Sequence, residues 1–242
     1  MKSLSVIIPI FNESKTILDV IETVKNCRLE NVYLKEIIVI DDASTDGSTA
    51  ILENYTDPIV RYIYKAKNQG KGSSLQIGFS EAQGDIVIIQ DGDLEYNPSD
   101  FQALLNPILE NKADVVYGSR FLVKRKWGQK MLLWRFANYL LTTFSNIFTG
   151  LHLTDMETCY KVFNRQTVEV FKGKLLSNRF EIEPELTAWV GYCKSRVTEV
   201  PISYIARTRE HGKKIGWKDG FQGVWAILRY HRKYFLNLHN KS

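Results

Sequence analysis

Residues 85–93, Asp-Ile-Val-Ile-Ile-Gln-Asp-Gly-Asp, decide the fold. The run begins with apolar, β-branched residues, which is typical of a strand covered on both faces of a parallel sheet. Two carboxylates, Asp91 and Asp93, follow where the strand stops. Hard cations such as Mg²⁺ and Mn²⁺ bind carboxylate oxygens together with phosphate oxygens. We therefore expect a metal and a diphosphate here, with Glu95 as a further donor. The alternative is a solvated acidic turn, because D-x-D is a short motif.

Strands alternate with helices around this stretch. Patterning predicts strands over residues 4–10, 36–40, 60–64, 85–90, 114–118 and 197–205. It predicts helices over residues 12–26, through 51–52, and over 70–82, 130–148 and 216–234, the last two amphipathic and rich in aromatic and basic residues. This order predicts an α/β fold, with a mostly parallel central sheet and helices on both faces. We expect one domain over residues 1–235, divided near 120, and a tail over 236–242.

The composition limits the classes of protein. The chain has 242 residues, 44% hydrophobic and 24% charged, which excludes a disordered chain or a collagen-like repeat. Its net charge of +5 suits an anionic partner. The three cysteines form no C-x-x-C pair, so we expect free thiols in a reducing compartment. No apolar run reaches about 18 residues, and no membrane-spanning helix is expected.

Polar turns follow the other predicted strands as well. Ligands of such sheets bind at the carboxyl ends of the strands, so these turns are expected on one edge. In the Asp41-Asp42 turn a carboxylate, Asp42 above all, is a candidate acceptor for a base N–H or ribose hydroxyls. Helix capping by Asp46 or Ser44 is the alternative for this turn. Gly70-Lys71-Gly72 lacks the full phosphate-loop pattern, since Lys65 stands where its first glycine is required. Lys71, at a predicted helix start, remains a candidate anion contact.

Basic residues are concentrated in the second half of the chain. A reaction on phosphates needs cations to balance charge, and a solubilising surface is the alternative for each. The set comprises Arg120, Arg135, Arg207, Arg209, His211, Lys213 and Lys214. The two amphipathic stretches suit a membrane surface, and a core-facing helix or a homodimer interface is equally consistent with them.

The ordered set of motifs resembles family 2 of the inverting glycosyltransferases, with a GT-A, Rossmann-like fold, and within it the dolichol-phosphate mannosyltransferase type. The resemblance spans residues 4–230. The motifs that carry it are Val6-Ile7-Ile8-Pro9-Ile10-Phe11-Asn12-Glu13, Ile40-Asp41-Asp42-Ala43-Ser44-Thr45-Asp46-Gly47, Gln90-Asp91-Gly92-Asp93-Leu94-Glu95, Gly118-Ser119-Arg120-Phe121 and Thr154-Asp155-Met156-Glu157-Thr158.

The resemblance implies transfer of a sugar, with inversion, from a nucleotide diphosphate sugar of the GDP-mannose or UDP-glucose type to a polyprenyl (dolichyl or undecaprenyl) phosphate. Mg²⁺ or Mn²⁺ would be the cofactor, and the protein would be cytoplasmic, in peripheral contact with the membrane. Residues 1–120 would bind the nucleotide sugar and 121–235 the acceptor. The implied nucleotide contacts are Pro9, Phe11, Glu13, Ile40 and Asp42, with Gly92 between the metal-binding carboxylates.

The resemblance also implies roles for the later residues. Arg120 would lie near the donor or acceptor phosphate, with Arg135 on the acceptor side. Arg207 and Lys213, with Lys214, would belong to a loop that closes over the donor.

This sequence departs from the family pattern at several positions. Phe11 replaces a tyrosine, Glu95 replaces a glutamine, and residues 155–158 differ in detail. The Q-x-x-R-W signature of processive synthases is absent, which argues against chain elongation.

Other functions remain open from sequence. A saccharide hydroxyl acceptor, as in cell-surface polysaccharide synthesis, would need a base, and Asp155 or Glu157 is the candidate. A nucleotidyltransferase is disfavoured because residues 11–14 are not glycine-rich. A non-catalytic membrane-surface binding module is the third alternative. No nucleic-acid partner is expected.

Overall fold

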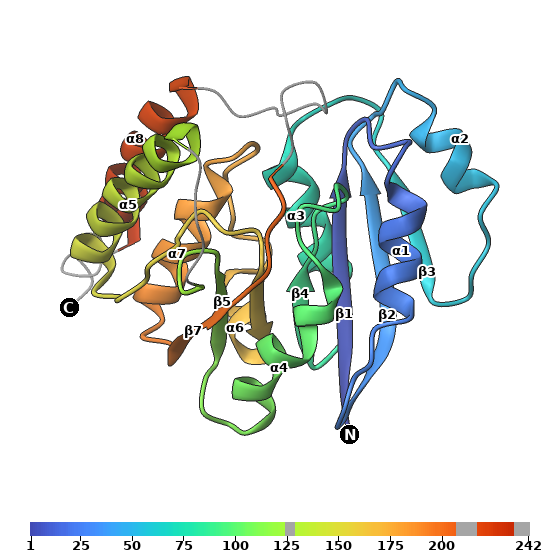
Figure 1. Ribbon diagram of the computed structural model, residues 1–242, viewed down its shortest axis with the longest axis horizontal. Coiled ribbons are helices and arrows are strands. Elements are labelled where there is room, and N and C mark those ends of the chain that lie inside the picture. Colours follow the sequence, from blue (N-terminus) through green and yellow to red (C-terminus); the bar gives the residue numbers. More distant parts are fainter. Residues whose placement is uncertain (124–128, 207–216, 235–242) are drawn as a thin grey trace.

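The computed structural model of the chain describes residues 1–123, 129–206 and 217–234 (Figure 1). For residues 129–131, 217–221 and 232–234 it describes the backbone without the side chains. The strands are β1 (Lys2–Ile10), β2 (Val32–Asp41), β3 (Val60–Tyr64), β4 (Ile86–Ile89), β5 (Val115–Ser119), β6 (Lys161–Asn164) and β7 (Val197–Pro201). The helices are α1 (Ile17–Lys25), α2 (Ser48–Glu53), α3 (Lys71–Glu81), the short 3₁₀ helix η1 (Pro98–Asp100), α4 (Phe101–Leu109), α5 (Gln129–Thr149), α6 (Arg165–Phe171), α7 (Ile182–Tyr192) and α8 (Trp217–Tyr234).

The strands form one sheet in the order β3-β2-β1-β4-β6-β5-β7. In the described part of the chain, every strand pair is parallel except the two that β6 makes with β4 and β5. The α/β class with a mostly parallel sheet is therefore confirmed. The patterning did not predict β6, α4, α6 or α7. It also placed the first helix too early, because residues before Ile17 form a turn in which Asn12 has a positive φ of 57°.

Helices cover both faces of the sheet. Tyr160, next to β6, contacts Phe101 of α4, whereas Phe163 of β6 contacts Phe79 of α3 and Phe171 of α6. Because Tyr160 and Phe163 are three residues apart along an extended chain, they point to opposite faces. α3 and α6 therefore cover the face opposite to α4. α5 and α8 contact each other and α7, and form the layer at the left of Figure 1.

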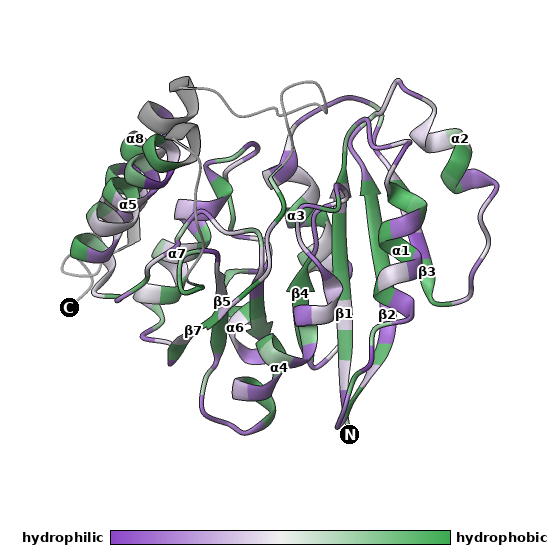
Figure 2. Ribbon diagram, in the orientation of Figure 1, coloured by the Kyte–Doolittle hydropathy of each residue, from purple (hydrophilic) through white to green (hydrophobic). Residues whose placement is uncertain are grey.

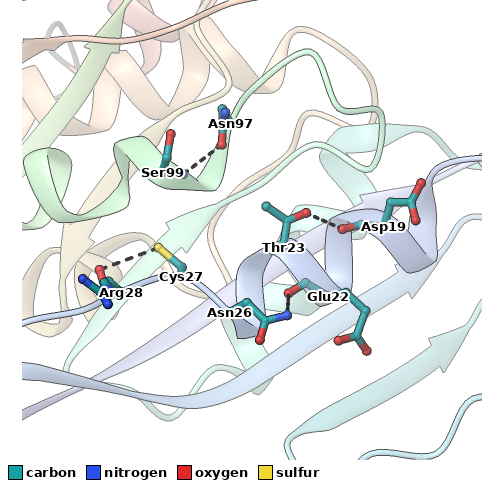
Figure 3. A pocket seen from close by; sticks show the side chains of 8 residues that line it. All are labelled: Asp19, Glu22, Thr23, Asn26, Cys27, Arg28, Asn97 and Ser99. Carbon is teal, nitrogen blue, oxygen red and sulfur yellow. Dashed lines mark hydrogen bonds between the residues drawn. The ribbon is translucent and has the colours of Figure 1, made fainter.

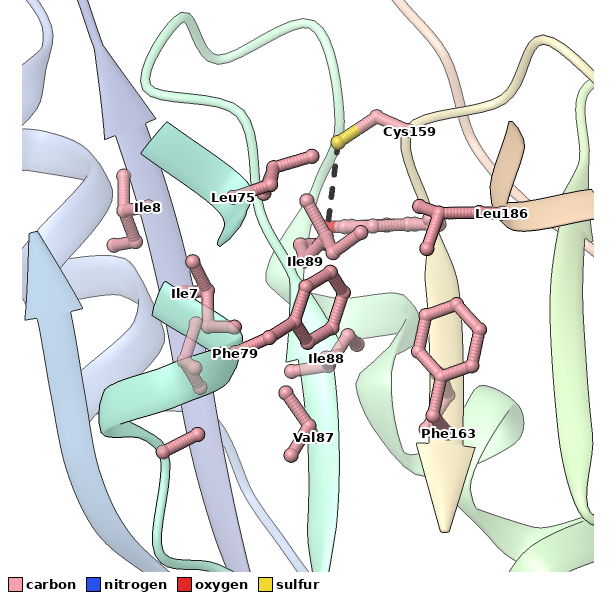
Figure 4. Close-up of a cluster of buried hydrophobic side chains, with 14 of the residues drawn as sticks. Ile7, Ile8, Leu75, Phe79, Val87, Ile88, Ile89, Cys159, Phe163 and Leu186 are labelled. Atoms are coloured by element: carbon pink, nitrogen blue, oxygen red, sulfur yellow. Dashed lines mark hydrogen bonds between the residues drawn. The ribbon is translucent and has the colours of Figure 1, made fainter. Parts of the chain in front are cut away.

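The core is the apolar interior of the central strands. Figure 2 shows hydrophobic residues along β1, β2 and β4, and polar residues in the connecting loops. Ile7, Ile88 and Phe79 are fully buried, and they meet Phe163 in the cluster of Figure 4. The Phe79 ring lies 4.9 Å from that of Phe171 and 5.7 Å from that of Phe163, both edge-on, as aromatic pairs prefer. This packing holds α3 and α6 rigidly on the sheet that positions the strand ends.

The glycines before and within α3 permit a close backbone approach. A Cβ at Gly72 would lie 2.2 Å from the Ser177 carbonyl oxygen and 2.8 Å from that of Arg179. The Ser73 amide donates to the Asn178 carbonyl at 2.9 Å across the same contact. The glycine pattern at residues 70–72 thus serves packing between α3 and residues 177–179.

Gly72→Ala is expected to destabilise the fold by about 1–3 kcal/mol, because backbone atoms must move to admit the methyl group. The matched control is Gly223→Ala on α8, where the added Cβ would meet Leu141 only at 3.5 Å or more. That change should be neutral or stabilising by up to about 1 kcal/mol, through higher helix propensity. Urea unfolding of both variants measures the difference; equal stabilities would contradict the packing role of Gly72.

Candidate functional site

The carboxyl ends of β1, β2 and β4 meet at one edge of the sheet. Pro9 of β1 is in register with Ile40 of β2. Thr16, after β1, donates through Oγ1 to the Gly92 carbonyl at 2.7 Å, and a Cβ on Gly92 would lie 3.6 Å from Cγ of Glu13. The structure thus brings together the predicted nucleotide contacts of β1 and β2 and the acidic turn after β4.

Asp42 anchors the connection into α3. Its side chain is buried and accepts from Lys65 Nζ at 2.5 Å, from the Gln69 amide at 2.9 Å and from the Gly70 amide at 2.6 Å. These contacts fix the path of residues 65–70 along the site edge. The neighbouring Asp41 accepts from Ser44 and from the Thr49 hydroxyl. The capping alternative fits Asp46, which accepts from the amide of Ser48, the first residue of α2, at 3.0 Å.

Lys71 lies between two carboxylates. Its Nζ is 2.9 Å from Asp91 Oδ1 and 3.1 Å from Glu183 Oε1 of α7. Burial opposes the charge of both Lys71 and Asp91, but their attraction outweighs it, raising the pKa of Lys71 and lowering that of Asp91. In this structure the anion partners of Lys71 are therefore side chains of the protein itself.

The chain of charges continues from Glu183. Its other carboxylate oxygen, Oε2, is 2.5 Å from Nζ of Lys161, which is fully buried in β6. Lys161 also donates to the carbonyls of Met156 at 2.9 Å and Thr158 at 2.5 Å. The sequence analysis missed Lys161 and Glu183; the only sequence signal is the acidic run Glu181-Ile182-Glu183-Pro184-Glu185 inside an otherwise apolar segment.

Asp93 and Glu95 extend the acidic turn toward the late segment of the chain. Asp93 Oδ1 accepts from the Glu95 amide at 3.1 Å, and Glu95 Oε2 accepts from the Tyr204 hydroxyl at 2.9 Å. The Ile205 amide donates to the Glu95 carbonyl at 2.9 Å. Glu95 therefore ties the turn to residues 204–205.

Asp91 and Asp93 suit a divalent cation that also binds the substrate's phosphates. Among the residues that the structure describes, no three His, Cys, Asp or Glu side chains form a metal cluster by themselves. Mg²⁺ in phosphate-transfer sites characteristically binds one or two carboxylates and completes its shell with substrate phosphates and water. Asp91 and Asp93, two residues apart at a strand end, fit that donor set, whereas Glu95 is engaged with Tyr204.

Arg120 and Asp155 form a buried ion pair. Arg120 donates to both Asp155 oxygens at 2.6 Å, and Asn138 of α5 donates to the same carboxylate at 3.0 Å. The guanidinium also lies 4.7 Å from the Trp134 ring centroid and 5.3 Å from that of Tyr204. Because Asp155 is fully buried and neutralised by Arg120, it is poorly placed to take a proton from an acceptor.

Arg135 lies beside this cluster, near its aromatic rim. Its guanidinium is exposed and lies 5.4 Å from the ring of Phe121. The other predicted cations, Arg207, Arg209, His211, Lys213 and Lys214, lie outside the described residues.

Glu157 is an acidic group with a raised pKa beside Glu183. Burial, together with the nearby charge of Glu183, raises its pKa to about 7. A carboxyl with such a pKa is matched to proton transfer near neutral pH.

A hollow of about 650 Å³ lies elsewhere, along α1 and η1 (Figure 3). It is lined by Asp19, Glu22, Thr23, Asn26, Cys27, Arg28, Asn97 and Ser99. None of the predicted site residues lines it.

Comparison with known proteins identifies the family of the chain. The family model described as Glycosyl transferase family 2 matches residues 5–171, which is more than half of the chain. The chain belongs to this family. Its relatives and motifs make it a dolichol-phosphate mannosyltransferase-like member.

Two relatives match nearly end to end. The chain is 25% identical to UDP-N-acetylglucosamine--dolichyl-phosphate N-acetylglucosaminyltransferase of Methanococcus voltae, over 94% of this chain and 95% of the relative. It is 26% identical to undecaprenyl-phosphate mannosyltransferase of Micrococcus luteus, over 93% and 92%.

The fold is similar to that of glucosyl-3-phosphoglycerate synthase from Mycobacterium tuberculosis, solved with Mn²⁺, UDP and glucosyl-3-phosphoglycerate. The TM-score is 0.67 at 18% identity, over 96% of this chain and 80% of that chain. The GT-A fold is thereby confirmed. Among the described residues, no helix combines the length and apolarity needed to cross a membrane.

Glu157→Gln is expected to change stability in a pH-dependent way. Because folding raises the pKa of Glu157 from 4.5 to about 7, the unfolded chain loses this proton first, and stability falls as pH rises through that window. Glutamine removes the effect, so the melting temperature of the variant relative to wild type should increase between pH 5 and pH 8. The control is the exposed Glu53→Gln, and a pH-independent difference for Glu157→Gln would contradict the raised pKa.

Proposed function

We propose that this protein transfers a sugar, with inversion, from a nucleotide diphosphate sugar to a polyprenyl phosphate. The observation that carries the proposal is that the carboxyl ends of three strands meet. The Asp91-Gly92-Asp93 turn lies beside Thr16 and Glu13, which follow β1, and the end of β1 pairs with the end of β2. An edge of this kind is where α/β sheets bind nucleotides. The printed functions of both polyprenyl-phosphate relatives support the acceptor class.

The donor would lie along this edge, with its base and ribose toward Pro9, Phe11, Ile40 and Asp42. Asp91 and Asp93 would hold a divalent cation, Mg²⁺ or Mn²⁺, which when bound offsets the charge on the departing nucleoside diphosphate. The solved relative with Mn²⁺ and UDP supports this cofactor class.

The acceptor phosphate would enter on the side of Arg120 and Arg135. A phosphate is already ionised at neutral pH, so it needs charge balance and alignment and no base. Asp155 holds Arg120 by two hydrogen bonds and thereby fixes the orientation of the cation. An in-line attack at the anomeric carbon then inverts its configuration. Arg207 and Lys213 remain proposed donor contacts.

The second candidate is transfer to a saccharide hydroxyl, which requires a base. Glu157, with its pKa of about 7, favours this reading, because a carboxyl poised near neutrality is suited to accept a hydroxyl proton. A hydroxyl acceptor therefore requires Glu157 as a base, whereas a phosphate acceptor does not.

An acceptor screen decides between the two reactions. The protein is incubated with Mn²⁺, a panel of nucleotide sugars, and either polyprenyl phosphate or oligosaccharides, and products are identified by mass spectrometry. We expect a glycolipid phosphate, and we expect Glu157→Gln to lower its rate by less than about tenfold, since no proton is abstracted. Saccharide products that vanish in Glu157→Gln would establish the second candidate.

Asp93→Ala tests the metal assignment. Activity should fall by about 10²–10³-fold, as is typical when a group that stabilises the transition-state charge is lost. The melting temperature should fall only slightly, because the change removes a half-buried side chain that accepts from the Glu95 amide. Full turnover of this variant in metal-free buffer would contradict the role.

We also propose that α5 contacts the cytoplasmic face of a membrane, where the lipid acceptor resides. Leu133 is 74% exposed and Phe136 is 57% exposed, with exposed Leu140 one turn further on the same helix. The net charge of +5 is complementary to anionic lipid. Apolar side chains on an amphipathic helix of a basic protein suit insertion at the headgroup boundary.

Leu133→Ser/Phe136→Ser should weaken co-sedimentation with phosphatidylglycerol vesicles by about tenfold or more, since each buried apolar side chain contributes about 1.5–3 kcal/mol. The control is Tyr33→Ser, an exposed aromatic residue on β2. Unchanged vesicle binding would contradict the proposal. If the wild-type protein is a dimer and the double variant is a monomer, this face is instead a homodimer interface.

A further inference from the structure

Four charged side chains alternate in sign across the site edge. Asp91, Lys71, Glu183 and Lys161 form consecutive ion pairs of 2.9, 3.1 and 2.5 Å. They come from the turn after β4, from α3, from α7 and from β6, so the chain of pairs crosses four elements. The exposed fraction of the side chains falls along it, from 23% at Asp91 through 15% at Lys71 to 4% at Glu183 and 0% at Lys161. Only the Asp91 end therefore meets the solvent to any extent.

A divalent cation at Asp91 competes directly with Lys71. Lys71 Nζ is 2.9 Å from Oδ1 of this carboxylate, so a cation that binds Asp91 weakens this ion pair, and a buried ammonium that loses its counter-ion is strongly destabilised. Glu183 removes this obstacle, because its Oε1 already lies 3.1 Å from Lys71 Nζ. Lys71 thus has a second counter-ion whether or not Asp91 is engaged elsewhere.

We propose that Glu183 is a positioning residue that serves as the alternate counter-ion of Lys71, so that Asp91 can exchange Lys71 for the divalent cation. This inference rests on the proposed function of Asp91. Lys161 holds Glu183 in place from its far side, and the same ammonium binds the carbonyls of Met156 and Thr158. Lys161 thereby connects Glu183, the alternate counter-ion of Lys71, to the segment that contains Asp155 and Glu157.

Mn²⁺ binding, measured by electron paramagnetic resonance of the free ion, tests the inference without turnover. In Glu183→Gln, Asp91 is the one ion-pair partner that the described residues leave to Lys71, so Mn²⁺ affinity should fall by about tenfold. The matched control is Glu185→Gln on the same helix, which is equally buried but accepts from the Leu176 and Ser177 amides. Its Mn²⁺ affinity should stay within about twofold of wild type, since among the described residues it bonds main-chain amides and not the Lys71 ammonium.

The double variant Lys71→Met/Glu183→Gln separates positioning from mere structural support. With Lys71 gone, Asp91 has no competing ammonium, so Mn²⁺ affinity should return to the wild-type value or exceed it. A structural role would instead make the two losses add. Lys161 loses its Glu183 partner in this variant just as it does in Glu183→Gln, so that loss is common to both and cannot account for a difference in Mn²⁺ affinity between them. Near-ultraviolet circular dichroism verifies the packing of both variants.

The outcomes are distinct. Wild-type protein that binds no Mn²⁺, alone or with a nucleoside diphosphate, overturns the proposed metal site itself. Wild-type binding with equal affinities in Glu183→Gln and Glu185→Gln overturns the counter-ion role alone. A defect in Glu183→Gln that persists in the double variant also overturns it.

Discussion

The parallel pairing of β1 with β2 on one side and β4 on the other is the constraint on which the site depends. Parallel strands end at the same edge, so side chains from positions 9–13, 40–42 and 91–93 meet although they are far apart in sequence. Two hydrogen bonds connect these ends directly. Thr16 Oγ1 donates to the Gly92 carbonyl, and the Asp42 amide donates to the Ile10 carbonyl. A different order of the same strands would disperse every acidic group of the site.

The edge carries an unusual amount of buried charge, and nearly all of it is paired. Arg120 is held by Asp155, and Lys71 and Lys161 share Glu183. Such pairs contribute little to stability by themselves, because desolvation offsets most of the attraction. Their use here is preorganisation, since cations and carboxylates fixed before substrate arrives need no reorientation during the reaction. The proposed transfer of a sugar between two phosphate groups has this requirement.

Much of the fold was predictable from local pattern. The apolar runs that end at Ile10, Ile40 and Ile89 identify buried parallel strands, and the polar residues after them mark the ligand edge. The β6 strand was not predictable, because Lys161–Asn164 is short and half polar, and it pairs antiparallel only through tertiary context. Glu183 and Lys161 were missed for a related reason: their partners lie 22 to 112 positions away, and only packing makes them neighbours. The glycines of residues 70–72 suggested an anion contact, and the structure shows them packing against residues 177–179.

A crystal structure of the protein with Mn²⁺ and a nucleoside diphosphate, with data collected at the manganese absorption edge, is the most direct test of the site. An anomalous peak beside the carboxylates of Asp91 and Asp93, with the diphosphate on its other side and the base near Asp42, is the result expected from this geometry. A peak and nucleotide bound elsewhere, such as in the hollow along α1, would contradict it.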